Sequence, residues 1–70
     1  MDKDLLEYLV SQGLKEFLLE EGYDFQNLTF SDLQGDGWGY HQFRAKEKGK
    51  KAFIICAEED EGMVFSINQI

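Results

Sequence analysis

Hydrophobic residues recur at spacings of three and four along the first part of the chain, between about residues 3 and 21. This spacing places apolar side chains on one face of an α-helix. Asp2 or Asp4 can cap the start of the helix, and Gly22 suits the position after its last turn. Gly13 interrupts the pattern and marks a bend or a close packing contact. We therefore expect one helix over about residues 3–21, with an apolar stripe of Leu5, Leu6, Leu9, Val10, Leu14, Phe17 and Leu18.

After Gly22 the pattern changes to the short apolar runs and alternation typical of β-strands. Four strands are predicted, separated by the glycine-containing stretches QGDG, EKGK and EDEG, which suit tight turns. The connections are too short for parallel crossovers, and the chain has no proline. The sequence thus predicts one α+β domain over residues 1–70, a helix followed by a four-stranded antiparallel meander, with strands at about residues 26–33, 38–47, 50–58 and 63–69.

The turns also predict how the strands pair. A two-residue turn at Lys48 and Gly49 would place Phe43 opposite Ile54 and His41 opposite Cys56. With loops at residues 34–37 and 59–62, all three registers agree on which side chains share a face. The predicted core face, covered by the helix, consists of Leu28, Phe30, Phe43, Ile54, Cys56, Met63, Phe65 and Ile67.

The opposite face of the sheet is predicted to lack a cover, because one helix cannot protect both faces. A contiguous apolar patch on an open face is typical of a contact surface. Trp38, at the exit of the first loop, is a further candidate anchor. The predicted protein-binding residues are Tyr40, Phe53, Ile55 and Val64 at the apolar centre, Arg44 and Lys51 at the rim, and Trp38.

The 70 residues include 14 acidic and seven basic ones, which gives a net charge of −7. Residues 1–37 hold nine of the acids, whereas residues 38–53 hold five of the basic residues and one acid. An acidic whole disfavours generic binding to nucleic acid or to an anionic membrane, and the basic segment leaves a local exception. The single Cys56 and the absence of a signal-like or membrane-length apolar run favour a cytoplasmic protein.

Three segments contain residue types that carry chemistry elsewhere. The glycine-rich GDGWGYHQF lies between two strands rather than before a helix, and Phe43 stands where a calcium loop needs a glutamate. His41 and Cys56 pair on the core face, where a thiol is inert. The EEDEG stretch is interpreted as a solvated turn. We therefore predict no enzyme activity, no cofactor and no metal site.

The leading hypothesis is a non-enzymatic, acidic protein-binding module, an inhibitor or adaptor that uses the open sheet face, the acidic helix or both. In size and charge the chain resembles small inhibitors, antitoxin-like proteins and phage-encoded antagonists. Its partner would be a larger protein, with a basic surface where the helix takes part. Two alternatives remain open: a homodimer formed through the same sheet face, and single-stranded nucleic-acid binding by the basic aromatic hairpin at residues 38–53.

Overall fold

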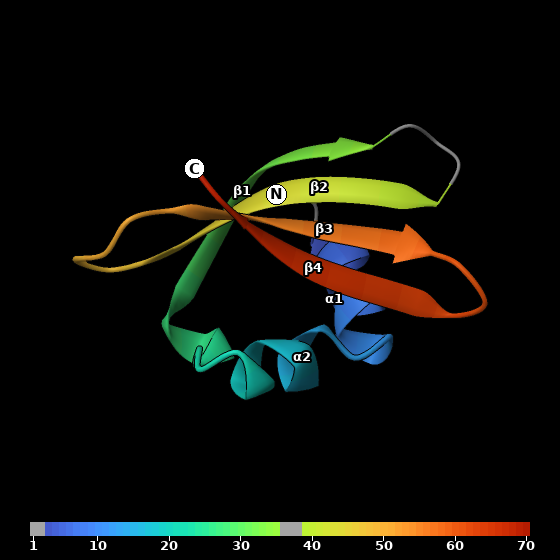
Figure 1. Ribbon diagram of the computed structural model, residues 1–70, viewed down its shortest axis with the longest axis horizontal. Coiled ribbons are helices and arrows are strands. Elements are labelled where there is room, and N and C mark those ends of the chain that lie inside the picture. Colours follow the sequence, from blue (N-terminus) through green and yellow to red (C-terminus); the bar gives the residue numbers. More distant parts are fainter. Residues whose placement is uncertain (1–2, 36–38) are drawn as a thin grey trace.

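The computed structural model describes residues 3–35 and 39–70, and it confirms the α+β arrangement (Figure 1). A pair of short helices precedes an antiparallel sheet whose four strands follow one another in chain order. The elements are α1 (Lys3–Ser11), α2 (Leu14–Glu20), the 3-10 turn η1 (Phe25–Asn27), β1 (Leu28–Gly35), β2 (Tyr40–Glu47), β3 (Phe53–Glu59) and β4 (Met63–Gln69).

The helical segment is divided at Gly13, where the prediction had one helix over residues 3–21. Gly13 has a φ of 104°, a left-handed conformation that glycine adopts without steric cost. It closes the end of α1 through a hydrogen bond from its N–H to the Val10 carbonyl, and its own carbonyl accepts the first bond of α2. The change of direction brings Leu9, Leu14 and Leu18 into the core, each with no exposed surface.

Gly22 ends α2 as the sequence predicts. The N–H of Gly22 donates to the Leu19 carbonyl and that of Tyr23 to the Leu18 carbonyl, the two bonds of a Schellman motif. The Tyr23 ring then stacks on Phe53, with 4.5 Å between the ring centroids. The helix end is thereby joined to the start of β3.

The pairing of β2 with β3 differs from the prediction by one residue. Phe43 lies opposite Ile55 and Ala45 opposite Phe53, so the predicted pairs of Phe43 with Ile54 and of His41 with Cys56 are wrong. The connection is not a two-residue turn, because the last paired residues leave a longer loop that includes Lys51 and Ala52. A shift of one residue in the pairing of a strand moves each of its side chains to the opposite face of the sheet.

The exchange reverses the predicted faces of β3. Phe53 is 2% exposed and Ile55 is 0% exposed, so their predicted place on the open face is wrong. Ile54 and Cys56, predicted to lie in the core, are on the open side and half-buried. The pairing of β3 with β4 is also shifted by one, with Cys56 opposite Ser66, which keeps Phe65 and Ile67 packed against the core.

All of the core lies on one side of the sheet, and Figure 1 shows the sheet passing in front of α1. The Tyr8 hydroxyl on α1 donates a hydrogen bond to the Glu59 carboxylate at the end of β3. This bond, with smaller effects from burial and from the Glu59 charge, raises the pKa of Tyr8. In the described part of the chain, no helix combines the length and apolarity needed to cross a membrane.

Candidate functional site

The candidate site is the outer face, defined as the side of the sheet opposite α1 and α2. Because successive side chains of a strand alternate between faces, the burial of Phe43, Phe53 and Ile55 places their neighbours here. The outer face comprises Thr29, Ser31, Asp32 and Gln34 from β1, Tyr40, Gln42, Arg44 and Lys46 from β2, Ile54, Cys56 and Glu58 from β3, and Val64, Ser66 and Asn68 from β4.

The apolar part of the outer face differs from the predicted patch. Val64 is on this face and is 54% exposed, and Tyr40 is half-buried at the same end of the sheet, with Glu58 of β3 between them. Ile54 and Cys56 take the central position that the sequence analysis assigned to Phe53 and Ile55. The result is a smaller apolar area, with aliphatic rather than aromatic side chains at its centre.

Side chains from three strands form hydrogen bonds around Cys56. The Tyr40 hydroxyl lies 3.4 Å from the Cys56 sulfur and 3.1 Å from the Gln42 side-chain oxygen. The hydroxyl has one proton, so it donates a hydrogen bond to only one of these two atoms at a time. The Asn68 amide donates to the same sulfur over 3.4 Å. These bonds hold side chains of β2, β3 and β4 in place across the outer face.

The geometry separates His41 from Cys56. His41 pairs with Ala57, and it shares its side of β2 with the buried Phe43, whereas Cys56 is on the outer face. The two side chains therefore cannot act together as a base and a nucleophile. Among described residues, the hydrogen bonds to the Cys56 sulfur come from the Tyr40 hydroxyl and the Asn68 amide.

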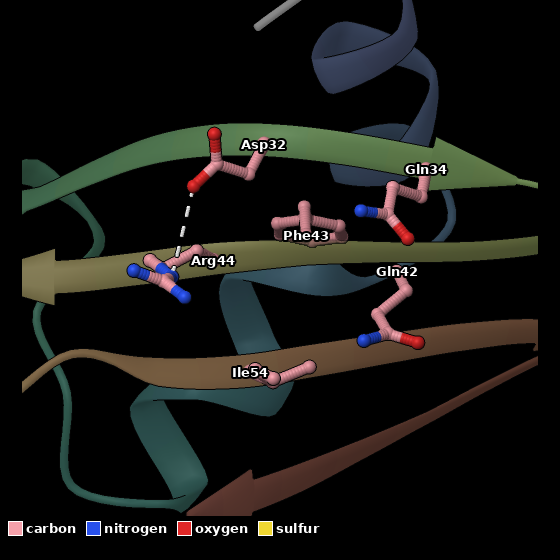
Figure 2. A pocket seen from close by; sticks show the side chains of 6 residues that line it. All are labelled: Asp32, Gln34, Gln42, Phe43, Arg44 and Ile54. Atoms are coloured by element: carbon pink, nitrogen blue, oxygen red, sulfur yellow. Dashed lines mark ion pairs between the residues drawn. The ribbon is translucent and has the colours of Figure 1, made fainter. Parts of the chain in front are cut away.

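A bulge in β1 shapes one part of the outer face. The pairing of β1 with β2 shifts between Ser31 and Gln34, and Asp32 has a positive φ of 56°. The result is a hollow of about 60 Å³. Figure 2 shows the Asp32 and Arg44 side chains at one end of it and the Gln34 and Gln42 amides at the other. This volume is about that of two water molecules, so it fits one small side-chain group rather than a cofactor.

The ion pair at this hollow is weak. The Arg44 guanidinium lies 3.7 Å from the Asp32 carboxylate, and both side chains are substantially exposed. Exposed pairs of this kind contribute about 0–1 kcal/mol. Arg44 therefore remains available to exchange Asp32 for an acceptor on another molecule.

The other predicted site residues are dispersed. Lys51 is exposed in the loop between β2 and β3, beyond the paired part of the sheet, and it lines an open hollow with Ala52, Gln69 and Ile70. Trp38 lies outside the described residues. The hairpin predicted to stack nucleic-acid bases has its phenylalanines, Phe43 and Phe53, buried in the core, which removes them from any such contact.

Part of the acidic stretch at residues 58–62 has a structural role. Glu59 binds the Tyr8 hydroxyl through its carboxylate, and its backbone N–H donates to the Gly39 carbonyl over 2.9 Å. Among residues 3–35 and 39–70, no group of three or more His, Cys, Asp or Glu side chains is arranged to hold a metal ion.

Comparison with known protein families, curated proteins and solved structures found no match to this chain.

Proposed function

We propose that this protein is a non-enzymatic binding module that attaches to a larger protein through its outer face. The observation that carries the proposal is the one-sided cover of the sheet. The apolar side chains of both helices pack against one face. On the other face Ile54 and Cys56 follow one another along β3, the Tyr40 hydroxyl lies against Cys56, and Val64 lies at the end of the sheet. Apolar side chains on an open sheet face are typical of contact surfaces.

The composition of the outer face supports a protein as the ligand. Interfaces combine an apolar centre with a polar rim that forms hydrogen bonds. Here Ile54 is at the centre, and Arg44, Gln42 and Asn68 surround it. The bonds between Tyr40, Cys56 and Asn68 order the polar side chains beforehand, which lowers the entropy cost of binding.

The acidic charge of the chain supports a partner of net positive charge. The helices carry much of this charge on the side of the sheet opposite the outer face, so they steer the approach of the partner and do not touch it. Asp4, Glu7, Glu16 and Glu20 are exposed on α1 and α2, against Lys3 and Lys15. A surface of one dominant sign steers a partner of opposite sign and repels partners of the same sign. This combination suits an inhibitor or an adaptor, which acts by occupying a surface rather than by chemistry.

The test begins with a photoreactive amino acid in place of Arg44 on the outer face, and with the same residue in place of Leu19 as a matched control. Leu19 is 71% exposed and lies on α2, away from the outer face. The Arg44 position is expected to cross-link one discrete protein in an extract of the source cells, and the Leu19 position is not.

Affinity for the purified partner then tests the site. Ile54→Lys is expected to weaken binding by about tenfold or more, as for a residue at the centre of an interface, whereas Leu19→Lys should change it by less than about twofold. Equal affinities for the two folded variants would place the contact elsewhere. A cross-link from Arg44 to a second copy of this chain would instead indicate a face-to-face homodimer.

A further inference from the structure

The two edges of the sheet differ in how they are protected. An edge strand exposes unpaired N–H and C=O groups, and natural proteins block such edges with bulges, charges or prolines. β1 has a bulge at Asp32, a charged residue with a φ of 56°. β4 has no bulge in its pairing with β3, and residues 63–69 (MVFSINQ) include no charged residue and no proline.

The outer edge of β4 is open in the described part of the chain. β4 is last in the strand order, and no backbone hydrogen bond from a loop or a helix among residues 3–35 and 39–70 reaches it. The core is also incomplete along this edge. Met63, Phe65 and Ile67 pack against the core but are only half-buried, whereas Phe53 and Ile55 on the neighbouring strand are buried.

We propose that β4 pairs with β4 of a second copy of this chain, antiparallel about a two-fold axis at Ser66, and forms a continuous eight-stranded sheet. A centre at Ser66 allows all seven residues of β4 to pair. Phe65 then lies opposite Ile67 of the second copy on the helix side, where each covers the other's open flank. Antiparallel partners share a face, so both helix pairs lie on the same side of the joined sheet.

The charges of the chain complement one another in this arrangement. The acidic stretch at residues 58–61 comes just before β4. The basic loop with Lys48, Lys50 and Lys51 comes just before β3. The start of β3 pairs with the end of β4, so the basic loop and the end of β4 lie at the same end of the sheet. In the antiparallel dimer, the start of β4 in one copy lies opposite the end of β4 in the other. The acidic stretch of each copy is therefore at the same end of the joined sheet as the basic loop of the other copy. Two strand spacings of about 5 Å separate β4 from β3 of the other copy, so the nearest opposite charges are about 10 Å apart, about one Debye length at 0.1 M salt.

A second copy fits this edge because the same chain supplies both the apolar flank and local opposite charges, which act against the repulsion between two chains of net charge −7. The pairing does not depend on the proposed function, since it uses the edge of the sheet and leaves the outer face open. It would place two outer faces side by side in one surface.

The test uses Ser66, which is exposed and lies on the two-fold axis. Molar mass is measured by sedimentation velocity over about a hundredfold range of protein concentration. Wild type should change from monomer to dimer. Ser66→Asp and Ser66→Lys each place like charges opposite one another and should raise the dissociation constant by roughly fivefold or more.

Mixing the two variants supplies the decisive control. An equimolar mixture of Ser66→Asp and Ser66→Lys places opposite charges across the axis, so dimerisation should return to at least the wild-type level. Thr29→Asp, an exposed position on the other edge strand, should dimerise like wild type. A wild-type monomer at every concentration would overturn the proposal. So would a dimer that Ile54→Lys disrupts but Ser66→Asp does not, because that result indicates face-to-face association.

Discussion

Two adjacent isoleucines on β3 have opposite environments. Ile55 is fully buried in the core, and Ile54 is half-buried on the outer face. Removing a buried Ile side chain costs its transfer free energy and leaves a cavity. Ile55→Ala is therefore expected to lower the free energy of unfolding by about 3 kcal/mol, and Ile54→Ala by about 1 kcal/mol. Urea unfolding followed by circular dichroism measures both.

The same pair of substitutions checks the register of the whole sheet. Equal losses, or a larger loss for Ile54→Ala, would contradict the pairing of Phe43 with Ile55. Ile55→Val is a matched control, since it removes one methylene group and should cost about 1 kcal/mol. A cost near zero for that variant would show that the site is loosely packed.

The face of β3 could not be predicted from its own residues. Phe53, Ile54, Ile55 and Cys56 are all apolar, so the segment lacks the alternation that distinguishes a buried face from an exposed one. The prediction rested on a two-residue turn at Lys48 and Gly49, whereas the paired strands end earlier and leave a longer loop. The core residues predicted on β1, β2 and β4 do lie on the core side, but the prediction omits Ala45 and also Leu33, which lies at the bulge in β1. The centre of the outer face was predicted wrongly.

At the scale of elements, α2 has acidic residues at its C-terminal end. Its last turn contains Glu20 and no basic residue, and Glu21 follows as the capping residue. Negative charge is unfavourable there because the helix dipole places its partial negative charge at that end. Glu16 also lies four residues before Glu20, so two like charges are neighbours on the helix surface.

Reversing the charge at position 20 should therefore stabilise the protein. Glu20→Lys is expected to raise the free energy of unfolding by about 0.5–1 kcal/mol, because it removes the repulsion and adds a favourable pair with Glu16. Thermal unfolding at low ionic strength measures the gain. Glu16→Lys is the matched control: it relieves the same repulsion but places a positive charge in the first turn of α2, so it should stabilise less than Glu20→Lys or destabilise. An equal gain from both variants would show that the repulsion, and not the helix dipole, is the cause.

The elements themselves were more predictable than their ends and junctions. The strand order follows from short connections, and Gly22 ends the helical segment where the spacing indicates. The sequence alone does not distinguish a break at Gly13 from a continuous helix, because a glycine inside a helix costs only about 1 kcal/mol. Its left-handed conformation is instead stabilised by the burial of Leu9 and Leu14 on either side.

At the scale of the whole molecule, charge is sorted by region and few charges are paired. Among described side chains the ion pairs are Arg44 with Asp32 and Lys50 with Glu47, and both are at the surface. The hydrogen bond from Lys50 to Glu47 raises the pKa of Lys50, but the side chain is exposed and the pair contributes little. A net charge of −7 therefore acts mainly as repulsion within the folded chain.

Salt should consequently stabilise the monomer. At a protein concentration low enough to exclude dimers, raising NaCl from about 0.05 M to about 0.5 M is expected to increase the melting temperature by roughly 3 °C, because screening weakens the repulsion. The double variant Glu20→Gln, Glu21→Gln reduces the net charge by two units and should show a smaller increase. A fall in melting temperature with salt would mean that attraction between the basic loop and the acidic segments outweighs the repulsion.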